Sequence, residues 1–308
     1  MCVNKLKDKI KLKLKREDGN VSLLVLLLMV ILLSSAGVAV DVGRIVIERA
    51  KLSNALDYAA LAGAQELPDD PDAARTVAMA YLNDNNIDPT NVSIDITEDH
   101  KTISLNGTKE MEFSFIRVLG FDKTNVVGSS KVILGAVSSV KGGLRPFAVE
   151  DFDYTYGTLI TLKQEGGDGY HGNYGVVALG ATGSGNYELN ALYGYKGEIA
   201  IGDEILTEPG NMANVSNVLK DYINNIPDTF ENFSRDSDRL WTVPLVDSLE
   251  ENGRGTVVVI GFAEVFVEDI QKKSGKIEIN ARFIRFVVNG KIDQTVEDRG
   301  TYGVKLVN

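Results

Sequence analysis

The sequence contains very little of the side-chain chemistry on which many enzyme and metal sites depend. Its 308 residues include one cysteine and two histidines. The cysteine is Cys2, at the N-terminus, so the rest of the chain has no thiol for a disulfide, a metal cluster or a cysteine–histidine pair. We expect His100 in an exposed turn and His171 in a glycine-rich loop of another domain. These shortages predict a non-enzymatic protein with no catalytic residues, no metal site and no cofactor.

Acidic residues outnumber basic residues beyond the N-terminus. The formal net charge is −11, although residues 1–18 carry seven basic and only three acidic residues. The acidic remainder would repel phosphate backbones, so no nucleic-acid partner is expected. Acidic clusters such as Glu150–Asp153 could supply oxygen ligands to Ca²⁺, but they lack the spacing of an EF-hand, and we interpret them as solvated loops. Gly180–Gly185 lacks the ending of a phosphate-binding loop and is interpreted as a loop between strands.

One long hydrophobic run is present near the N-terminus. Val21–Val40 is uncharged, and as a helix twenty residues at about 1.5 Å each would span the ~30 Å hydrocarbon core of a bilayer. We therefore predict a transmembrane anchor at 19–40 that contacts the lipid bilayer, preceded by a basic cytoplasmic leader at 1–18. The anchor residues singled out are Val21, Leu24, Leu28, Ile31 and Val40.

A cleaved signal peptide is the competing interpretation of this run. Ala36–Ala39 could imitate a cleavage site, but the apolar core of a signal peptide usually has about 7–15 residues. The helical pattern also continues past Asp41 without a break, which favours a retained anchor. The basic residues before the run place the N-terminus in the cytoplasm and the C-terminal region outside a bacterial cytoplasmic membrane.

The next hundred residues predict a helical stem and a small α+β domain at 41–140. A helix should continue through Asp41–Leu67, and its small residues either dock on their own domain or form a packing surface shared with partner subunits. Asp70 before Pro71 predicts the N-cap of a second helix, which ends near Leu82. The expected elements that follow are a hairpin (strands near 92–96 and 103–105), a short helix at 113–119 and a strand at 126–137, giving an α-β-β-α-β order.

A β-rich extracytoplasmic domain is predicted at 141–308, after the turn at Lys141–Gly143. Short apolar runs separated by many turn signals favour strands, and one helix is expected at 214–224. The fold class is therefore α+β. The predicted strands are 158–163, 174–179, 198–201, 240–246, 256–268 and 276–288.

The N-terminal third resembles the TadE/TadG-like proteins of the Tad (Flp pilus) assembly system. The similarity rests on Arg16–Asn20, the apolar run, Ala39–Arg44 and Leu52–Gln65. It implies a single-pass membrane protein that helps to assemble or anchor a surface pilus, with other Tad membrane proteins as partners; self-association through the small-residue helix is left open. The stem residues that match the family motif are Asp41, Gly43, Arg44, Asn54, Asp57, Ala59 and Gly63.

Two departures from related proteins refine this expectation. Pseudopilin relatives carry a glutamate five positions after their processed glycine, where this chain has Leu24, so we expect an uncleaved assembly factor and not a filament subunit. Larger relatives carry an Asp-x-Ser-x-Ser metal motif, whereas this chain has only Asp236–Asp238. The region 144–286 also looks like the exported domain of some such anchors, through 172–175, 207–212 and 243–247.

Two other functions remain as alternatives. The β-rich domain could make the chain a surface-exposed binding module or adhesin. An exported hydrolase would require Asp168, His171 and a further polar group to converge on a cleft.

Overall fold

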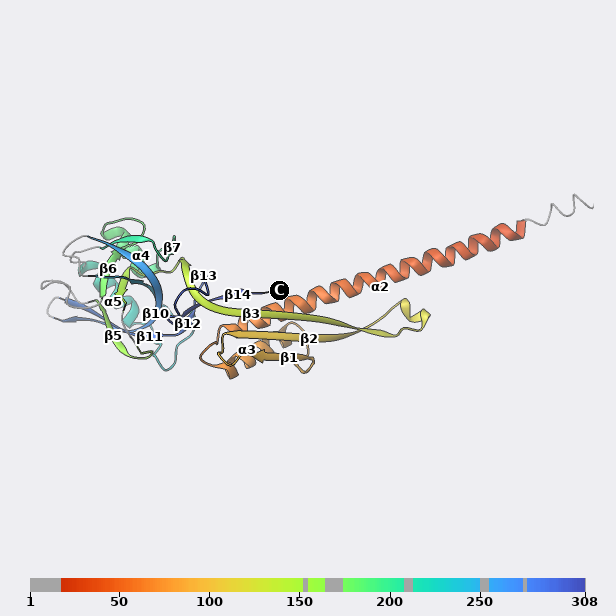
Figure 1. Ribbon diagram of the computed structural model, residues 1–308, viewed down its shortest axis with the longest axis horizontal. Coiled ribbons are helices and arrows are strands. Elements are labelled where there is room, and N and C mark those ends of the chain that lie inside the picture. The colour runs from red at the N-terminus through yellow and green to blue at the C-terminus, as the bar shows by residue number, and fades with distance from the viewer. Residues whose placement is uncertain are drawn as a thin grey trace, which may run out of the picture. The chain divides into compact units, whose positions relative to one another are not determined.

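A computed structural model describes residues 18–151, 155–163, 174–207, 213–249, 255–273 and 276–307. The fold is mixed α+β: an N-terminal apolar helix is followed by a β-rich part (Figure 1). The chain divides into two compact units. Within the described residues, unit 1 contains 18–57, 82–93 and 105–129, and unit 2 contains 58–81, 94–104 and 130–307. The basic leader and Cys2 lie outside the described residues.

The apolar run and the predicted stem form one uninterrupted helix, α2 (Asp18–Ala64). No proline interrupts it, and it ends where turns begin at Gln65. The second helix, α3 (Pro71–Asp84), begins as the sequence predicts, because the Ala73 N–H donates to Asp70 Oδ1 at 2.8 Å. Proline at the first helical position has no N–H to leave unpaired.

The first sheet has the strand order β1-β2-β3-β14-β12, with β13 and β7 also paired to β3. The predicted hairpin is confirmed, and the C-terminal β14 pairs antiparallel with β3, Tyr302 opposite Ala136. A 3₁₀ turn, η1 (Pro89–Asn91), precedes β1. The strands are β1 (Val92–Ile96), β2 (Thr102–Glu112), β3 (Lys123–Lys141), β7 (Glu198–Ala200), β12 (Phe286–Val287), β13 (Gly290–Ile292) and β14 (Thr301–Leu306).

The prediction of a short helix at 113–119 is wrong in the type of helix and in its length. The structure has a 3₁₀ helix, η2 (Ile116–Leu119), at the tip of the hairpin between β2 and β3. Gly120 ends it with φ 90°, a left-handed conformation that suits glycine. The N–H groups of Ser114, Phe115 and Ile116, just before and at the start of η2, donate to a side chain on α2.

The second sheet has the order β5-β11-β10-β8-β6-β4-β9, and β10 also pairs with β9. Its core contains Phe147, Trp241, Val265 and Phe283, none more than 1% exposed. Helix α5 (Ala213–Asn224) was predicted, and its Leu219 joins this core. The strands are β4 (Phe147–Glu150), β5 (Leu159–Lys163), β6 (Tyr174–Ala178), β8 (Glu204–Thr207), β9 (Leu240–Val246), β10 (Thr256–Lys273) and β11 (Lys276–Ile284).

The prediction of one helix in 141–308 is wrong, because a second helix, α4 (Ser184–Tyr193), is present. The loop at Gly180–Gly185 therefore leads from β6 into a helix and not into another strand. Its N-cap, Gly183, offers no side chain for a capping hydrogen bond, so the usual start signal is missing. Burial of Tyr187 and Ala191 in the core holds this helix in place.

Candidate functional site: the anchor helix and its stem

The first part of α2 has no protein covering it in the part of the chain that the structure describes. Every residue from Val21 to Ala36 is exposed, and α2 is long and apolar enough to cross a membrane, since it contains an 18-residue window with a mean hydropathy of 2.9. An exposed apolar surface of this extent is rare on a water-soluble monomer. The predicted anchor residues Val21, Leu24, Leu28, Ile31 and Val40 are 49–65% exposed.

Asp41, the first charged residue after the apolar run, fastens the hairpin tip to α2. Its carboxylate is fully buried and accepts N–H groups from Ser114 (3.0 Å), Phe115 (2.7 Å) and Ile116 (2.7 Å). The Arg44 guanidinium lies 3.6 Å from Asp41 Oδ1 and also donates to the Ser114 hydroxyl. We call these five residues the Asp41 clasp. Because only donors face the carboxylate, the clasp fits an ionised aspartate.

Two glycines of α2 near the clasp differ in their surroundings. A Cβ on Gly37 would lie 2.8 Å from the Phe115 Cβ, so any larger residue would push the hairpin tip away. A Cβ on Gly43 would meet no atom within 4 Å. Packing within the described residues therefore requires Gly37 but gives no reason for Gly43, although Gly43 belongs to the family motif.

Further along the stem, a charged contact joins α2 to β2. Lys109 Nζ and Lys51 Nζ each donate to the Glu48 carboxylate at 2.8 Å. These hydrogen bonds lower the pKa of Glu48 from 4.5 to about 2. The Glu48 side chain is 21% exposed, so the contact directs the register of helix and strand more than it stabilises them.

The stem packs closely on the sheet where the strands carry glycine. Leu52 and Leu56 are fully buried. A Cβ on Gly107 or on Gly128 would lie only 3.1–3.2 Å from a Leu56 methyl group. The helix can approach β2 and β3 because these two positions have no side chain.

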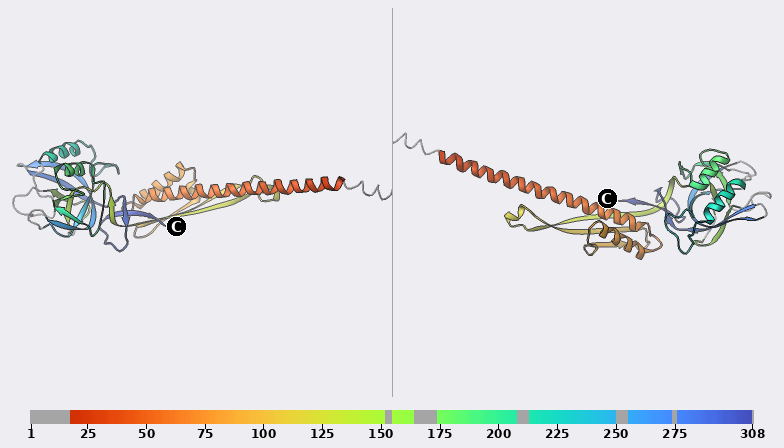
Figure 2. Two further views of the ribbon diagram at one scale, coloured as in Figure 1. Left: turned by 90° about the horizontal axis from the view of Figure 1, so that it is seen from above. Right: turned by 180° about the vertical axis from the view of Figure 1, so that it is seen from behind.

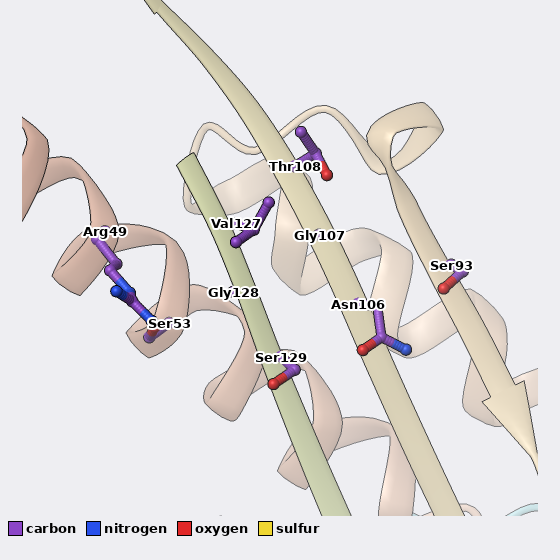
Figure 3. A pocket seen from close by; sticks show the side chains of 9 residues that line it. All are labelled: Arg49, Ser53, Ser93, Asn106, Gly107, Thr108, Val127, Gly128 and Ser129. Atoms are coloured by element: carbon purple, nitrogen blue, oxygen red, sulfur yellow. The ribbon is translucent and has the colours of Figure 1, made fainter. Parts of the chain in front are cut away.

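A shallow hollow of about 650 Å³ lies beside this contact. Figure 3 shows its lining on α2 and on three neighbouring strands. Arg49 is the charged residue in the lining, and no acid or base faces it there, so the hollow offers no acid–base pair. The lining residues are Arg49, Ser53, Ser93, Asn106, Gly107, Thr108, Val127, Gly128 and Ser129.

The remaining family-motif residues fall at the end of α2. Ala59 is fully buried, and a Cβ on Gly63 would lie 2.8 Å from the Ala74 carbonyl oxygen of α3. These two small residues therefore dock on their own chain. This was one of the two alternatives for the small residues of the stem, the other being a packing surface shared with partner subunits. Asn54 is exposed and Asp57 is half-buried.

Of the two histidines, His100 lies within the described residues. His100 is exposed in the hairpin turn, with Nδ1 3.2 Å from the Pro68 carbonyl oxygen. Asp168 and His171, on which a hydrolase would depend, lie outside the described residues. Within the residues that the structure does describe, no group of three or more His, Cys, Asp or Glu could hold a metal ion.

These features define a class of protein: an α+β chain whose N-terminal apolar helix is a candidate membrane anchor and continues into a packed stem. Residues 19–66 match the family model described as "Putative Flp pilus-assembly TadE/G-like". This match confirms the resemblance for α2 and the turn after it. Comparison of the chain with curated proteins and with solved structures gave no match.

Proposed function

We propose that this chain is a non-enzymatic, single-pass membrane protein that assists the assembly or anchoring of a Tad/Flp-type surface pilus. The observation that carries the proposal is the coincidence of the family match at 19–66 with the uncovered apolar helix and its stem. Other Tad membrane proteins are the proposed partners. The N-terminus lies in the cytoplasm and the β-rich part lies outside the bacterial cytoplasmic membrane.

The composition of α2 suits a membrane-spanning helix. Twenty uncharged residues satisfy their backbone hydrogen bonds internally as a helix, which is what a lipid environment requires. Asp41 then lies at the end of the span, where three N–H groups and Arg44 compensate its charge. An ionised group at this boundary costs far less than one inside the hydrocarbon.

Deletion with complementation tests the function. Removing the gene should abolish or reduce surface pili counted by electron microscopy, and the full chain should restore them. A chain with Leu28→Arg should fail to restore pili, because arginine at the centre of a span costs about 2.5–3.5 kcal/mol on insertion scales. The matched control is Leu206→Arg, at a leucine of β8 that is 41% exposed; it should restore pili. Unchanged piliation after deletion would overturn the proposed function.

A further inference from the structure

The tip of the β2–β3 hairpin exposes four large apolar side chains. Phe115, Val118, Leu119 and Phe121 are 53%, 89%, 65% and 63% exposed, and we call these four the apolar tip. They fall within seven consecutive residues around η2. An exposed apolar group of this kind usually marks a surface that contacts lipid or protein.

Contacts along the hairpin show which end of α2 the tip approaches. Gly107 lies against Leu56 and Leu52, Lys109 bonds to Glu48, Ser114 bonds to Asp41, and Phe115 meets Gly37. As β2 advances, its contacts therefore move steadily back toward the apolar run. Figures 1 and 2 show η2 beside α2 at this end of the hairpin.

The depth of the apolar tip relative to the end of the membrane span follows from helix geometry. Gly37 lies inside Val21–Val40, about 6 Å along the axis from Asp41 at 1.5 Å per residue. Apolar side chains of membrane-surface proteins enter the headgroup and acyl boundary by about 5–10 Å. Phe115 contacts Gly37, and the other three residues of the apolar tip come shortly after Phe115 in the chain. If Val21–Val40 spans the bilayer, the apolar tip therefore lies at the depth of the headgroup and acyl boundary.

The charged residues of the tip are compatible with this position. Arg117 Nε is 3.1 Å from Asp122, and Lys123 Nζ is 2.6 Å from Glu110. Pairing lowers the cost of bringing these groups near lipid, and the long Arg117 stem can carry its charge back to the headgroups.

We propose that the apolar tip inserts into the outer leaflet of the membrane that α2 spans, as a second and shallower lipid contact. The inference rests on the proposed membrane anchoring. The Asp41 clasp joins the two lipid contacts, which are the spanning part of α2 and the apolar tip. The stem is therefore held in the membrane at two points. Rotation of α2 about its axis is thereby restricted.

Depth-dependent quenching in the full chain tests this inference. An environment-sensitive fluorophore is attached to Leu119→Cys in a Cys2→Ser background, and the protein is placed in vesicles of phosphatidylethanolamine and phosphatidylglycerol with spin-labelled lipids. The probe should show blue-shifted emission and be quenched most by lipids labelled near the headgroup. Val118→Cys provides a second position with the same expected result.

Two matched positions complete the design. Val127→Cys, on β3 and 56% exposed, lies next to Gly128 at the level of Leu52–Leu56 and should remain unquenched. Leu28→Cys, within the span, should be quenched by lipids labelled deep in the acyl chains. If the probe at Leu28 is quenched but the probe at Leu119 is unquenched, like the one at Val127, the proposed insertion of the tip is wrong. The proposed membrane anchor would be unaffected by that result.

The other outcomes are also decisive. An unquenched Leu28 position would mean that the anchor itself is wrong, and both proposals would fall. Shielding of the labelled Leu119 position without lipid quenching, together with disulfide-linked pairs when the unlabelled Leu119→Cys chain is treated with an oxidant, would show that a second copy covers the tip and would refute lipid insertion.

Discussion

Glu264 should give the protein a pH-dependent stability that can be measured directly. It is 3% exposed on β10 inside the second sheet, and Thr242 Oγ1 donates to its Oε2 at 2.7 Å. Burial raises the pKa of Glu264 from 4.5 to about 7, and Thr242 and Arg145 only partly oppose this. The folded chain therefore keeps a proton that the unfolded chain loses at a lower pH.

The sign and size of the effect follow from this difference. Between pH 4.5 and about 7 the folded state binds more protons, so the free energy of unfolding falls as the pH rises through this window. At about 1.36 kcal/mol for each unit of pKa difference, the loss from about pH 5 to about pH 8 is roughly 2–3 kcal/mol. Glu264→Gln removes the titrating group, so this part of the pH dependence should disappear and the variant should exceed the parent in stability at the higher pH.

The single tryptophan provides the assay. Trp241 is fully buried beside Thr242 and stacks on Phe147 at 5.1 Å between ring centroids. Its fluorescence during guanidinium unfolding of the full chain in nanodiscs reports this core at both pH values. Glu204→Gln, at an exposed glutamate of β8, is the matched control and should keep the parent slope. Equal pH slopes for the parent and Glu264→Gln would refute the reasoning.

Three further predictions concern the stem. Asp41→Asn should speed amide hydrogen exchange at residues 114–116, because the neutral side chain can accept through one oxygen only. Leu56→Ala should lower the free energy of unfolding by about 2–5 kcal/mol, through lost burial and the cavity left, as measured by resistance to proteolysis. Gly63→Leu should destabilise by about 1–3 kcal/mol from overpacking against α3, whereas Gly43→Leu, with the same gain in helix propensity and open space around it, should not.

Each of these has a clear contrary result. Unchanged amide exchange at residues 114–116 in the Asp41→Asn variant would show that the Asp41 carboxylate does not hold the hairpin tip on α2. A protease-resistant Leu56→Ala chain would show that the stem does not depend on its contact with Gly107 and Gly128. Equal stability of the Gly63 and Gly43 variants would show that α2 and α3 do not pack as closely as described.

Local signals in the sequence explain which elements could be predicted. Helix α2 has no proline to interrupt it, the cap at Asp70 precedes a proline, and the alternating residues of β1 mark one face of a strand. Each of these features is fixed by neighbours within a few positions. The same holds for α5, in which Leu219 and Ile223, four residues apart, enter the core.

Elements fixed by distant contacts could not be predicted in this way. Helix α4 has no capping side chain and forms because Tyr187 and Ala191 reach the core. The pairing of β14 with β3 joins residues such as Tyr302 and Ala136, for which no local pattern exists. In the site, Asp41 was identified from the family motif alone. Its role depends on Ser114, 73 residues later in the chain, and no spacing rule connects the two.

Thiol labelling of spheroplasts tests the central claim most directly. In the proposed orientation, Cys2 is in the cytoplasm and Val127 is beyond the membrane. A membrane-impermeant maleimide added to spheroplasts should label Val127→Cys in a Cys2→Ser background, and should label the natural Cys2 only after lysis. Labelling of Cys2 from outside, or protection of the Val127 position until lysis, would contradict the membrane orientation on which the proposed function rests.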